Sequence, residues 1–200
     1  MEFLFNIKNK TMQVNPVESS VKKTTEEEHL IIAARKNASH FAPLYERYHE
    51  PIFRFVYQRL NDKSDAFDIT QQVFLKALSN ISNYENRGLP FSSWLYRIAT
   101  NEMNSFFKKN SSKRTVNIET PCLNIIMEDM QYNYERDAME LLLMDVIAGL
   151  PDEELLLIEM RFFEKRPFKE IAEILNLTEN NAKVKTYRLL EKMKTLLTKK

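Results

Sequence analysis

The sequence predicts an all-α protein made of two small helical domains joined by a flexible linker. Only two glycines, Gly88 and Gly149, occur in 200 residues, which leaves few positions for the left-handed turns of β-hairpins and phosphate-binding loops. Apolar residues recur at helical intervals along most of the chain, and the pattern lapses for long only near residues 110–131. With 44% hydrophobic residues, each side of that lapse can build a core of its own.

The first domain is expected over residues 25–110, after a disordered tail at residues 1–24 in which no hydrophobic period is found. Its first helix should begin at Thr24 or Thr25, because Thr25 and Glu28 have the spacing of a capping box.

Three further helices complete this domain. The second follows Ser39 and takes Pro43 into its first turn, where the backbone N–H would have no helical partner in any case. The third follows a turn at residues 62–65, and the fourth starts near Ser92 after a loop at residues 84–90. Their apolar residues keep helical spacing: Leu44, Tyr48, Ile52 and Val56 in the second, Ala66, Ile69, Val73 and Ala77 in the third, and Leu95, Ile98, Ala99 and Met103 in the fourth.

The linker is placed at residues 111–133, where serines and Pro121 interrupt the helical pattern. It also carries four apolar residues, so part of it is expected to dock on a partner. These residues are Leu123, Ile125, Ile126 and Met127.

The second domain is expected over residues 134–200. Helical periodicity runs up to Gly149, and further helices are predicted at residues 152–163, 167–175 and 179–197.

The last two of these helices form a predicted helix-turn-helix through Asn176, Leu177 and Thr178. Asn176 tolerates a left-handed conformation, Thr178 can cap the next helix, and Ala172 is small enough for a close helix crossing. Helical geometry turns Ala182, Thr186, Leu189, Met193 and Leu196 inward, and groups Asn180, Lys183, Val184, Tyr187 and Arg188 on the opposite face. An ordinary helical hairpin with a basic surface remains the alternative.

Positive charge gathers in two stretches, although the net charge is only +1. Seven basic residues and one acidic residue follow position 180, a local net charge of +6. Residues 97–114 hold five basic residues and one acidic residue, a local net charge of +4. Two basic patches indicate two contacts with a polyanion, while a solvated charged face is the alternative.

Four segments together resemble the sigma-70 family, and specifically its compact extracytoplasmic-function (ECF) group. Residues 44–48 (LYERY), 65–77 (DAFDITQQVFLKA) and 94–101 (WLYRIATN) resemble region 2, and residues 150–197 resemble region 4. The resemblance implies a region 2 helical bundle followed by a region 4 helix-turn-helix. It also implies a transcription initiation factor that needs no cofactor and is not an enzyme.

By this resemblance, the helix at residues 68–76 would dock on the beta-prime clamp of core RNA polymerase, through Asp68, Gln71, Gln72 and Lys76. The loop at residues 84–91 and the helix after it would melt the minus-ten element and hold its non-template strand. Asn101 and Ser105 would lie beside a pocket for a flipped base, Lys108 and Lys109 would follow the DNA backbone, and Trp94 would belong to the core.

Region 4, by the same resemblance, would read the minus-thirty-five element and contact the beta flap. The base-reading set would be Asn180, Lys183, Val184 and Tyr187, and the phosphate-binding set Lys185, Arg188 and Lys192. The expected partners are core RNA polymerase and promoter DNA; many members of the family also bind an anti-sigma factor, and the sequence leaves open whether this chain has one.

One cysteine, Cys122, and the lack of a secretory or membrane-spanning pattern predict a cytoplasmic protein without membrane insertion. An enzyme is disfavoured because His29, His40 and His49, all expected at the surface, accompany no metal-ligand spacing or nucleophile motif. A dimeric regulator that binds DNA alone would explain residues 150–200 but not residues 94–101. Copurification with core polymerase would separate these two functions.

Overall fold

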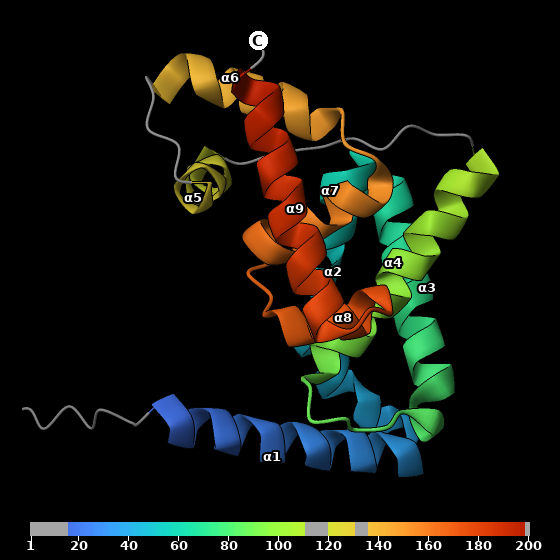
Figure 1. Ribbon diagram of the computed structural model, residues 1–200. Coiled ribbons are helices and arrows are strands. Elements are labelled where there is room, and N and C mark those ends of the chain that lie inside the picture. Colours follow the sequence, from blue (N-terminus) through green and yellow to red (C-terminus); the bar gives the residue numbers. More distant parts are fainter. Residues whose placement is uncertain (1–15, 111–119, 131–135, 199–200) are drawn as a thin grey trace, which may run out of the picture.

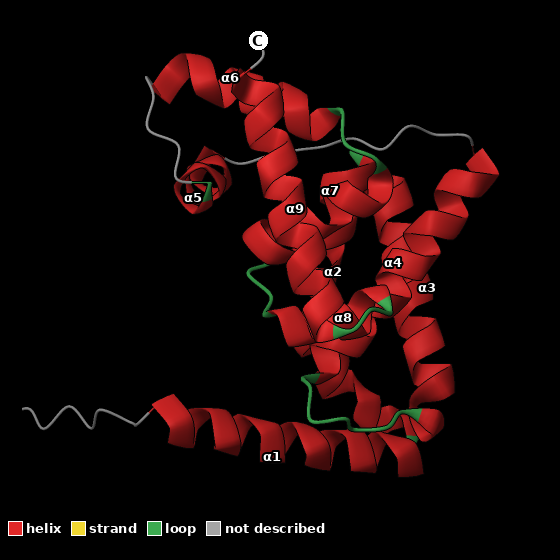
Figure 2. Ribbon diagram, viewed as in Figure 1, coloured by secondary structure: helices red, strands yellow, loops and turns green. Residues whose placement is uncertain are grey.

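The computed structural model describes residues 16–110, 120–130 and 136–198, and all regular structure in these ranges is helical (Figures 1 and 2). The side chains of residues 16–25, 120–121 and 136–139 are not described. No helix within the described ranges combines the length and the apolar composition needed to cross a membrane.

Helix α1 (Pro16–Lys36) lies across one end of the molecule (Figure 1). It begins eight residues before Thr24, so the last part of the tail predicted over residues 1–24 is helical. Proline is favoured in the first turn of a helix because its fixed backbone angle suits that turn and its missing N–H has no partner to lose. A short 3-10 helix, η1 (Ala38–Phe41), then turns the chain into the bundle.

Helices α2 (Ala42–Leu60), α3 (Lys63–Asn80) and α4 (Phe91–Asn110) pack on one another as a three-helix bundle. The side chain of Asp62 caps α3 by accepting a hydrogen bond of 2.8 Å from the backbone N–H of Asp65, which starts this helix inside the predicted turn. A second 3-10 helix, η2 (Ile81–Asn83), precedes the loop at residues 84–90. The side chains fully buried between these helices include Leu44, Ile52, Phe55, Val73 and Leu95.

The predicted linker contains a helix, α5 (Thr120–Asp129). Leu123 and Ile126 are almost completely buried, and α5 packs against α6 and η3 of the C-terminal part. Of the four apolar residues expected to dock on a partner, Leu123, Ile126 and Met127 therefore dock on the chain itself, whereas Ile125 is exposed. A ten-residue helix is too short to be stable alone, so this packing is what holds it.

The C-terminal part consists of α6 (Arg136–Ala148), α7 (Asp152–Ile158), the π-helix η3 (Glu159–Phe163), α8 (Phe168–Leu175) and α9 (Glu179–Thr198). The single helix predicted at residues 152–163 thus changes its winding after Ile158. The wider π turn sets Glu159 inward, where it is buried against α2.

The helix-turn-helix is formed by α8 and α9 as predicted. Asn176 adopts the left-handed conformation, with φ 55° and ψ 48°. The hydroxyl of Thr178 accepts a hydrogen bond of 3.2 Å from the backbone N–H of Asn181, which caps α9. One expectation is wrong: Leu196 is exposed and Leu197 is buried instead, because residues three and four positions after Met193 lie on either side of the inward stripe.

The N-terminal part of the molecule (α1 to α4) and its C-terminal part (α6 to α9) pack directly on each other, chiefly through α4 and α8 (Figure 1). Arg59 of α2 and Glu159 of η3 form an ion pair of 2.5 Å, and only 2% and 5% of their side chains are exposed. The Arg59 guanidinium also lies 3.5 Å from the centre of the Phe55 ring. The sequence predicted two domains but gave no sign that they would associate.

Candidate nucleic-acid interface

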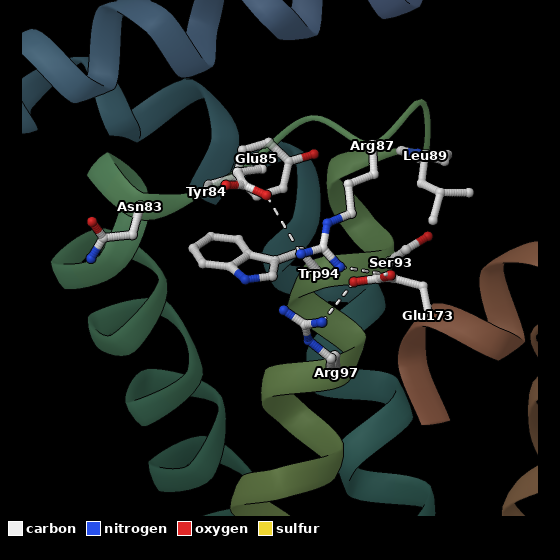
Figure 3. Close-up of a pocket in the computed structure, with 10 residues that line it drawn as sticks. Asn83, Tyr84, Glu85, Arg87, Leu89, Ser93, Trp94, Arg97 and Glu173 are labelled. Carbon is white, nitrogen blue, oxygen red and sulfur yellow. Dashed lines mark hydrogen bonds and ion pairs between the residues drawn. The ribbon is translucent and has the colours of Figure 1, made fainter. Parts of the chain in front are cut away.

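A cavity of about 210 Å³ lies where the loop at residues 84–90 meets the first turns of α4 (Figure 3). Tyr84 and Trp94 supply aromatic walls, and the guanidinium groups of Arg87 and Arg97 reach into it. The turn of the loop is made by Gly88, whose φ of +69° favours glycine. An aromatic wall beside cationic groups suits an unstacked base and its phosphate.

Helix α1 holds this loop in place. The Glu27 carboxylate accepts a hydrogen bond of 3.0 Å from the backbone N–H of Phe91 and another from the Tyr48 hydroxyl. Arg35 donates to the carbonyls of Ile81 and Tyr84, on either side of the loop's start. Sequence reasoning gave α1 no such role, because its hydrogen bonds to Ile81, Tyr84 and Phe91 join residues 46 to 64 positions apart.

Trp94 and Tyr84 belong both to the cavity and to the core. The rings of Trp94, Tyr84 and Phe91 pack together, with centres 5.0 to 5.3 Å apart. Burial, and then the negative charge of Glu27, raise the pKa of Tyr84 to about 12, so its hydroxyl stays protonated at neutral pH. Trp94 is half-buried and packs against the core, so the expectation of a core position holds only in part.

Asn101 and Ser105 are exposed on α4, but neither lines the small cavity. The Ser105 hydroxyl donates a hydrogen bond of 2.9 Å to the carbonyl of Asn101. Asn101 instead lines a larger groove of about 970 Å³ between α4 and the C-terminal helices. Lys108 and Lys109 are exposed about one turn beyond Ser105 on α4.

The outer face of α9 is accessible as predicted. Tyr187 is 45% exposed and touches the Phe168 ring, and Val184 is half-buried. The polar and basic members of the predicted set are all exposed: Asn180, Lys183, Lys185, Arg188 and Lys192. Lys185, Arg188 and Lys192 line the same large groove as Asn101, so two predicted DNA-binding surfaces share one space.

The predicted docking face of α3 is also accessible. Asp68, Gln72 and Lys76 are exposed, and Lys76 pairs with Glu102 at 2.6 Å. Gln71 is half-buried and donates a hydrogen bond of 3.1 Å to the Tyr45 hydroxyl.

Two exposed apolar residues flank this face, and the sequence did not lead us to predict them as part of it. Phe67 is 50% exposed and Leu75 is 56% exposed. Their signal in the sequence is that both fall outside the inward stripe of α3 although both are large and apolar.

A cluster of acidic residues from the C-terminal part contacts α4 and was also missed. Glu173 pairs with Arg97 at 2.6 Å and with Arg87 at 3.6 Å, and so closes one side of the small cavity (Figure 3). Glu164 accepts a hydrogen bond of 2.6 Å from Tyr96.

Glu170 completes this cluster. It accepts a hydrogen bond of 3.0 Å from Ser93 and pairs with Arg166 at 2.7 Å. Arg166 in turn donates to the Ser92 hydroxyl at 2.9 Å. Each of these contacts between the two parts joins residues 68 to 86 positions apart, beyond the reach of a local pattern.

One histidine departs from its predicted surface position. His49 is half-buried, and its ring packs on those of Tyr45, Phe53 and Phe74. His29 and His40 are exposed as expected. Among the described residues, no group of three or more histidine, cysteine, aspartate and glutamate side chains is placed to hold a metal ion.

Two family profiles match the chain. "Sigma-70 region 2" matches residues 44–113, and "Sigma-70, region 4" matches residues 140–193. The first match covers nearly all of α2 together with α3, the loop and α4, and the second covers α7, η3 and α8 together with most of α6 and α9.

Curated relatives carry the same family name. The chain is 27% identical over 164 residues to the ECF RNA polymerase sigma factor BldN of Streptomyces coelicolor, an alignment that covers 80% of this chain and 61% of BldN. It is 29% identical over 150 residues to the RNA polymerase sigma factor SigV of Bacillus subtilis, covering 75% of this chain and 86% of SigV.

The fold resembles a solved structure of CnrH in complex with the cytosolic domain of CnrY. The TM-score is 0.58 at 16% identity, over 86% of this chain and 97% of the other. At this identity the likeness concerns the fold.

Proposed function

The chain belongs to the extracytoplasmic-function group of the sigma-70 family and acts in promoter-specific transcription initiation by RNA polymerase, and we propose that it melts the minus-ten element with α4 and the loop at residues 84–90 and reads the minus-thirty-five element with α9. On this proposal the protein binds and opens DNA and catalyses no reaction of its own.

The observation that carries the minus-ten assignment is the cavity at the loop. Opening a duplex without an energy source requires a surface that binds unstacked bases better than paired ones. The ring of Trp94 can stack on a base, and Arg87 and Arg97 can neutralise the phosphates beside it. Asn101, Lys108 and Lys109 then continue the contact along the exposed side of α4.

The minus-thirty-five assignment is supported by the outer face of α9. Its N-terminal half carries exposed Asn180, Lys183 and Tyr187, which can donate to base edges or pack on thymine methyl groups in a major groove. Lys185, Arg188 and Lys192 follow toward the side and the C-terminal half of the helix, where phosphates would lie.

Docking on core polymerase is proposed for α3, through Asp68, Gln72 and Lys76 against the beta-prime clamp. Phe67 and Leu75 extend this face, and burying two half-exposed apolar side chains adds a hydrophobic contribution to a polar contact. Region 4 is proposed to contact the beta flap.

A protein that regulates access to these surfaces is a further proposed partner. CnrH was solved in complex with the cytosolic domain of CnrY. An anti-sigma factor of this chain would have to contact the same helices that promoter DNA and polymerase need.

Substitution of Asn101 tests the proposal. Holoenzyme with Asn101→Ala should bind a closed promoter normally and open it less, because losing a polar contact to an unstacked base costs about 1–3 kcal/mol. Permanganate reactivity of thymines in the minus-ten region, on a promoter selected from a genomic library with the wild-type holoenzyme, reports the opening.

The control is Ser64→Ala, which removes an exposed polar group from the first turn of α3. Its thymine reactivity should match that of the wild type. Full reactivity in the Asn101→Ala holoenzyme would remove α4 from the opening step, and operator binding by the chain without core polymerase would favour an ordinary DNA-binding regulator.

A further inference from the structure

We propose that the acidic residues Glu164, Glu170 and Glu173 of the C-terminal part form an interaction surface for the minus-ten face of α4, so that the uncomplexed chain holds its own α8 where promoter DNA would bind. This inference rests on the proposed function of α4. It adds that α8 of the same chain competes with promoter DNA for α4.

At the cavity, the carboxylate of Glu173 occupies the place that a DNA phosphate would take beside two arginines. The carboxylate of Glu173 lies between the guanidinium groups of Arg97 and Arg87, at 2.6 and 3.6 Å (Figure 3). A nucleic-acid phosphate offers the same chemistry, namely negatively charged oxygens that accept charge-assisted hydrogen bonds from arginine. While Glu173 is in place, it occupies a donor of Arg97 and lowers the net positive charge that Arg97 and Arg87 would offer to a phosphate.

The contacts along the first turns of α4 extend the same principle. The Tyr96 hydroxyl donates to Glu164 at 2.6 Å, and the Ser93 hydroxyl donates to Glu170 at 3.0 Å. Both α4 residues are almost completely buried. The donors of this face are therefore unavailable to DNA, and they become available only when the C-terminal part moves away.

The chemistry of this contact favours reversible separation. Its charged and hydroxyl groups can be hydrated after opening, unlike a purely apolar contact. The buried pair of Arg59 and Glu159 lies at the same junction and is likewise a pair of groups that water solvates well. Polymerase, which would bind the two parts at separate sites, would supply the free energy that keeps them apart.

The groove beside this contact supports the same conclusion. Asn101 of α4 lines one wall, and Lys185 and Arg188 of α9 line the groove as well, together with Glu153 and Glu154 of α7. Asn101 of the proposed minus-ten surface and the phosphate-binding residues of α9 therefore line one groove in the uncomplexed chain, whereas the base-reading residues of α9 lie outside it. A promoter that presents its two elements at separate positions cannot use both surfaces in this arrangement.

The test weakens the acidic surface without touching the proposed DNA-binding residues. The variant Glu164→Gln/Glu173→Gln keeps the shape of both side chains and removes both charges. The full-length uncomplexed protein is titrated into a fluorescein-labelled pool of short random single strands, and its radius of gyration is measured by small-angle X-ray scattering. The variant should expand and should bind the strands about tenfold more tightly, since apparent affinity rises with the fraction of competent molecules.

The matched control is Glu179→Gln/Glu191→Gln, which removes two exposed carboxylates of the same domain that lie outside the contact. It reports any gain in DNA affinity that comes from net charge alone. A second pair makes the test sharper: Glu173→Lys sets a positive charge against Arg97 and Arg87, and Glu179→Lys makes the same change on α9. Circular dichroism verifies that each variant is folded.

The outcomes separate the two proposals. The inference is overturned if both contact variants keep the compactness and the DNA affinity of the wild type, or if the controls gain as much affinity as the contact variants. In either case, normal promoter opening by the holoenzyme leaves the proposed function intact. If the Asn101→Ala holoenzyme opens promoters fully, the proposed function fails whatever the uncomplexed variants do. Expansion with about tenfold tighter binding, confined to the contact variants, supports the inference.

Discussion

Tyr96 shows at the scale of one residue how the contact between the two parts is held. Its ring is 1% exposed, its hydroxyl donates to Glu164, and the Arg166 guanidinium lies 4.2 Å from the ring centre. Burial above all, and then the negative charge of Glu164, raise the pKa of the Tyr96 hydroxyl above its ordinary value. The folded chain therefore binds the phenolic proton more tightly than the unfolded chain.

This difference predicts how stability responds to alkali. The stabilisation from Tyr96 is complete below the unfolded pKa of about 10, and it is lost as pH rises above that value toward the folded pKa. Tyr96→Phe removes the hydrogen bond to a charged acceptor and should lower the free energy of unfolding by about 1–2 kcal/mol at neutral pH. It should also lose less stability than the wild type between about pH 9 and 11.

Urea unfolding across this range measures both effects. Tyr84, whose pKa is also raised, contributes equally to the wild type and the variant and cancels from the comparison. If the two proteins lose stability in parallel above pH 10, Tyr96 is not the group that titrates.

At the scale of elements, α1 acts as a support for the loop that lines the cavity. The Glu27 carboxylate accepts a hydrogen bond from the backbone N–H of Phe91, and Arg35 donates hydrogen bonds to two carbonyls at the start of the loop. Asn86, within the loop, donates to Glu28 at 3.4 Å. The loop thus keeps its form through side chains of a helix that lies outside the region 2 match.

Glu27→Ala should loosen this support, because it leaves a backbone donor and the Tyr48 hydroxyl without their acceptor, a loss of about 1–3 kcal/mol. Amide hydrogen exchange should speed up at residues 84–91, and promoter opening should fall while core polymerase binding stays unchanged.

The neighbouring change Glu26→Ala is the control. Glu26 is exposed and pairs only with half-exposed Arg47 in the described contacts, and such a surface pair is worth less than about 1 kcal/mol. Equal exchange at residues 84–91 in both variants would mean that α1 does not position the loop.

The helices themselves were largely predictable, because each shows its apolar stripe in the sequence. The left-handed Asn176 and the cap at Thr178 were predictable as well, since both depend on local backbone chemistry. Helix α5 was not recognised, although Leu123, Ile126 and Met130 have helical spacing, because Pro121 and its short length favoured a linker. The sequence did not predict the π turn that begins at Glu159, nor its ion pair with Arg59 a hundred residues away.

At the scale of the whole molecule, the sequence could not predict that the two parts would associate. The ion pair of Arg59 and Glu159 joins two helices that each look ordinary in isolation. A buried ion pair adds little net stability, but removing one partner leaves the other charge in a poorly solvated place. We infer that the ion pair of Arg59 and Glu159 specifies which surfaces of the two parts meet.

A double-mutant cycle on this pair is the corresponding prediction. Arg59→Met should destabilise the folded chain by up to about 3–5 kcal/mol, and less if the parts separate and Glu159 becomes hydrated. Arg59→Met/Glu159→Met should recover most of that loss. Thermal unfolding of the single and double variants gives the coupling free energy.

The exposed pair of Lys192 and Glu154 provides the comparison. Their side chains are 48% and 33% exposed, and the same cycle there should give a coupling below about 1 kcal/mol. Equal coupling in the two cycles would show that burial of the Arg59 pair has no energetic consequence.

The docking of α5 also sets a limit on distance. Nine residues separate Asn110, the end of α4, from Thr120, the start of α5, and a chain of that length spans at most about 35 Å even when fully extended. Promoter elements some 25 base pairs apart lie about 85 Å from each other along the duplex axis. With α5 seated on α6 and η3, the tether covers less than half of that separation, and undocking of α5 would extend it to the 25 residues between Asn110 and Arg136. On the proposed function, the docking of α5 would therefore limit the length of the tether between the two DNA-binding parts, and its undocking would lengthen that tether.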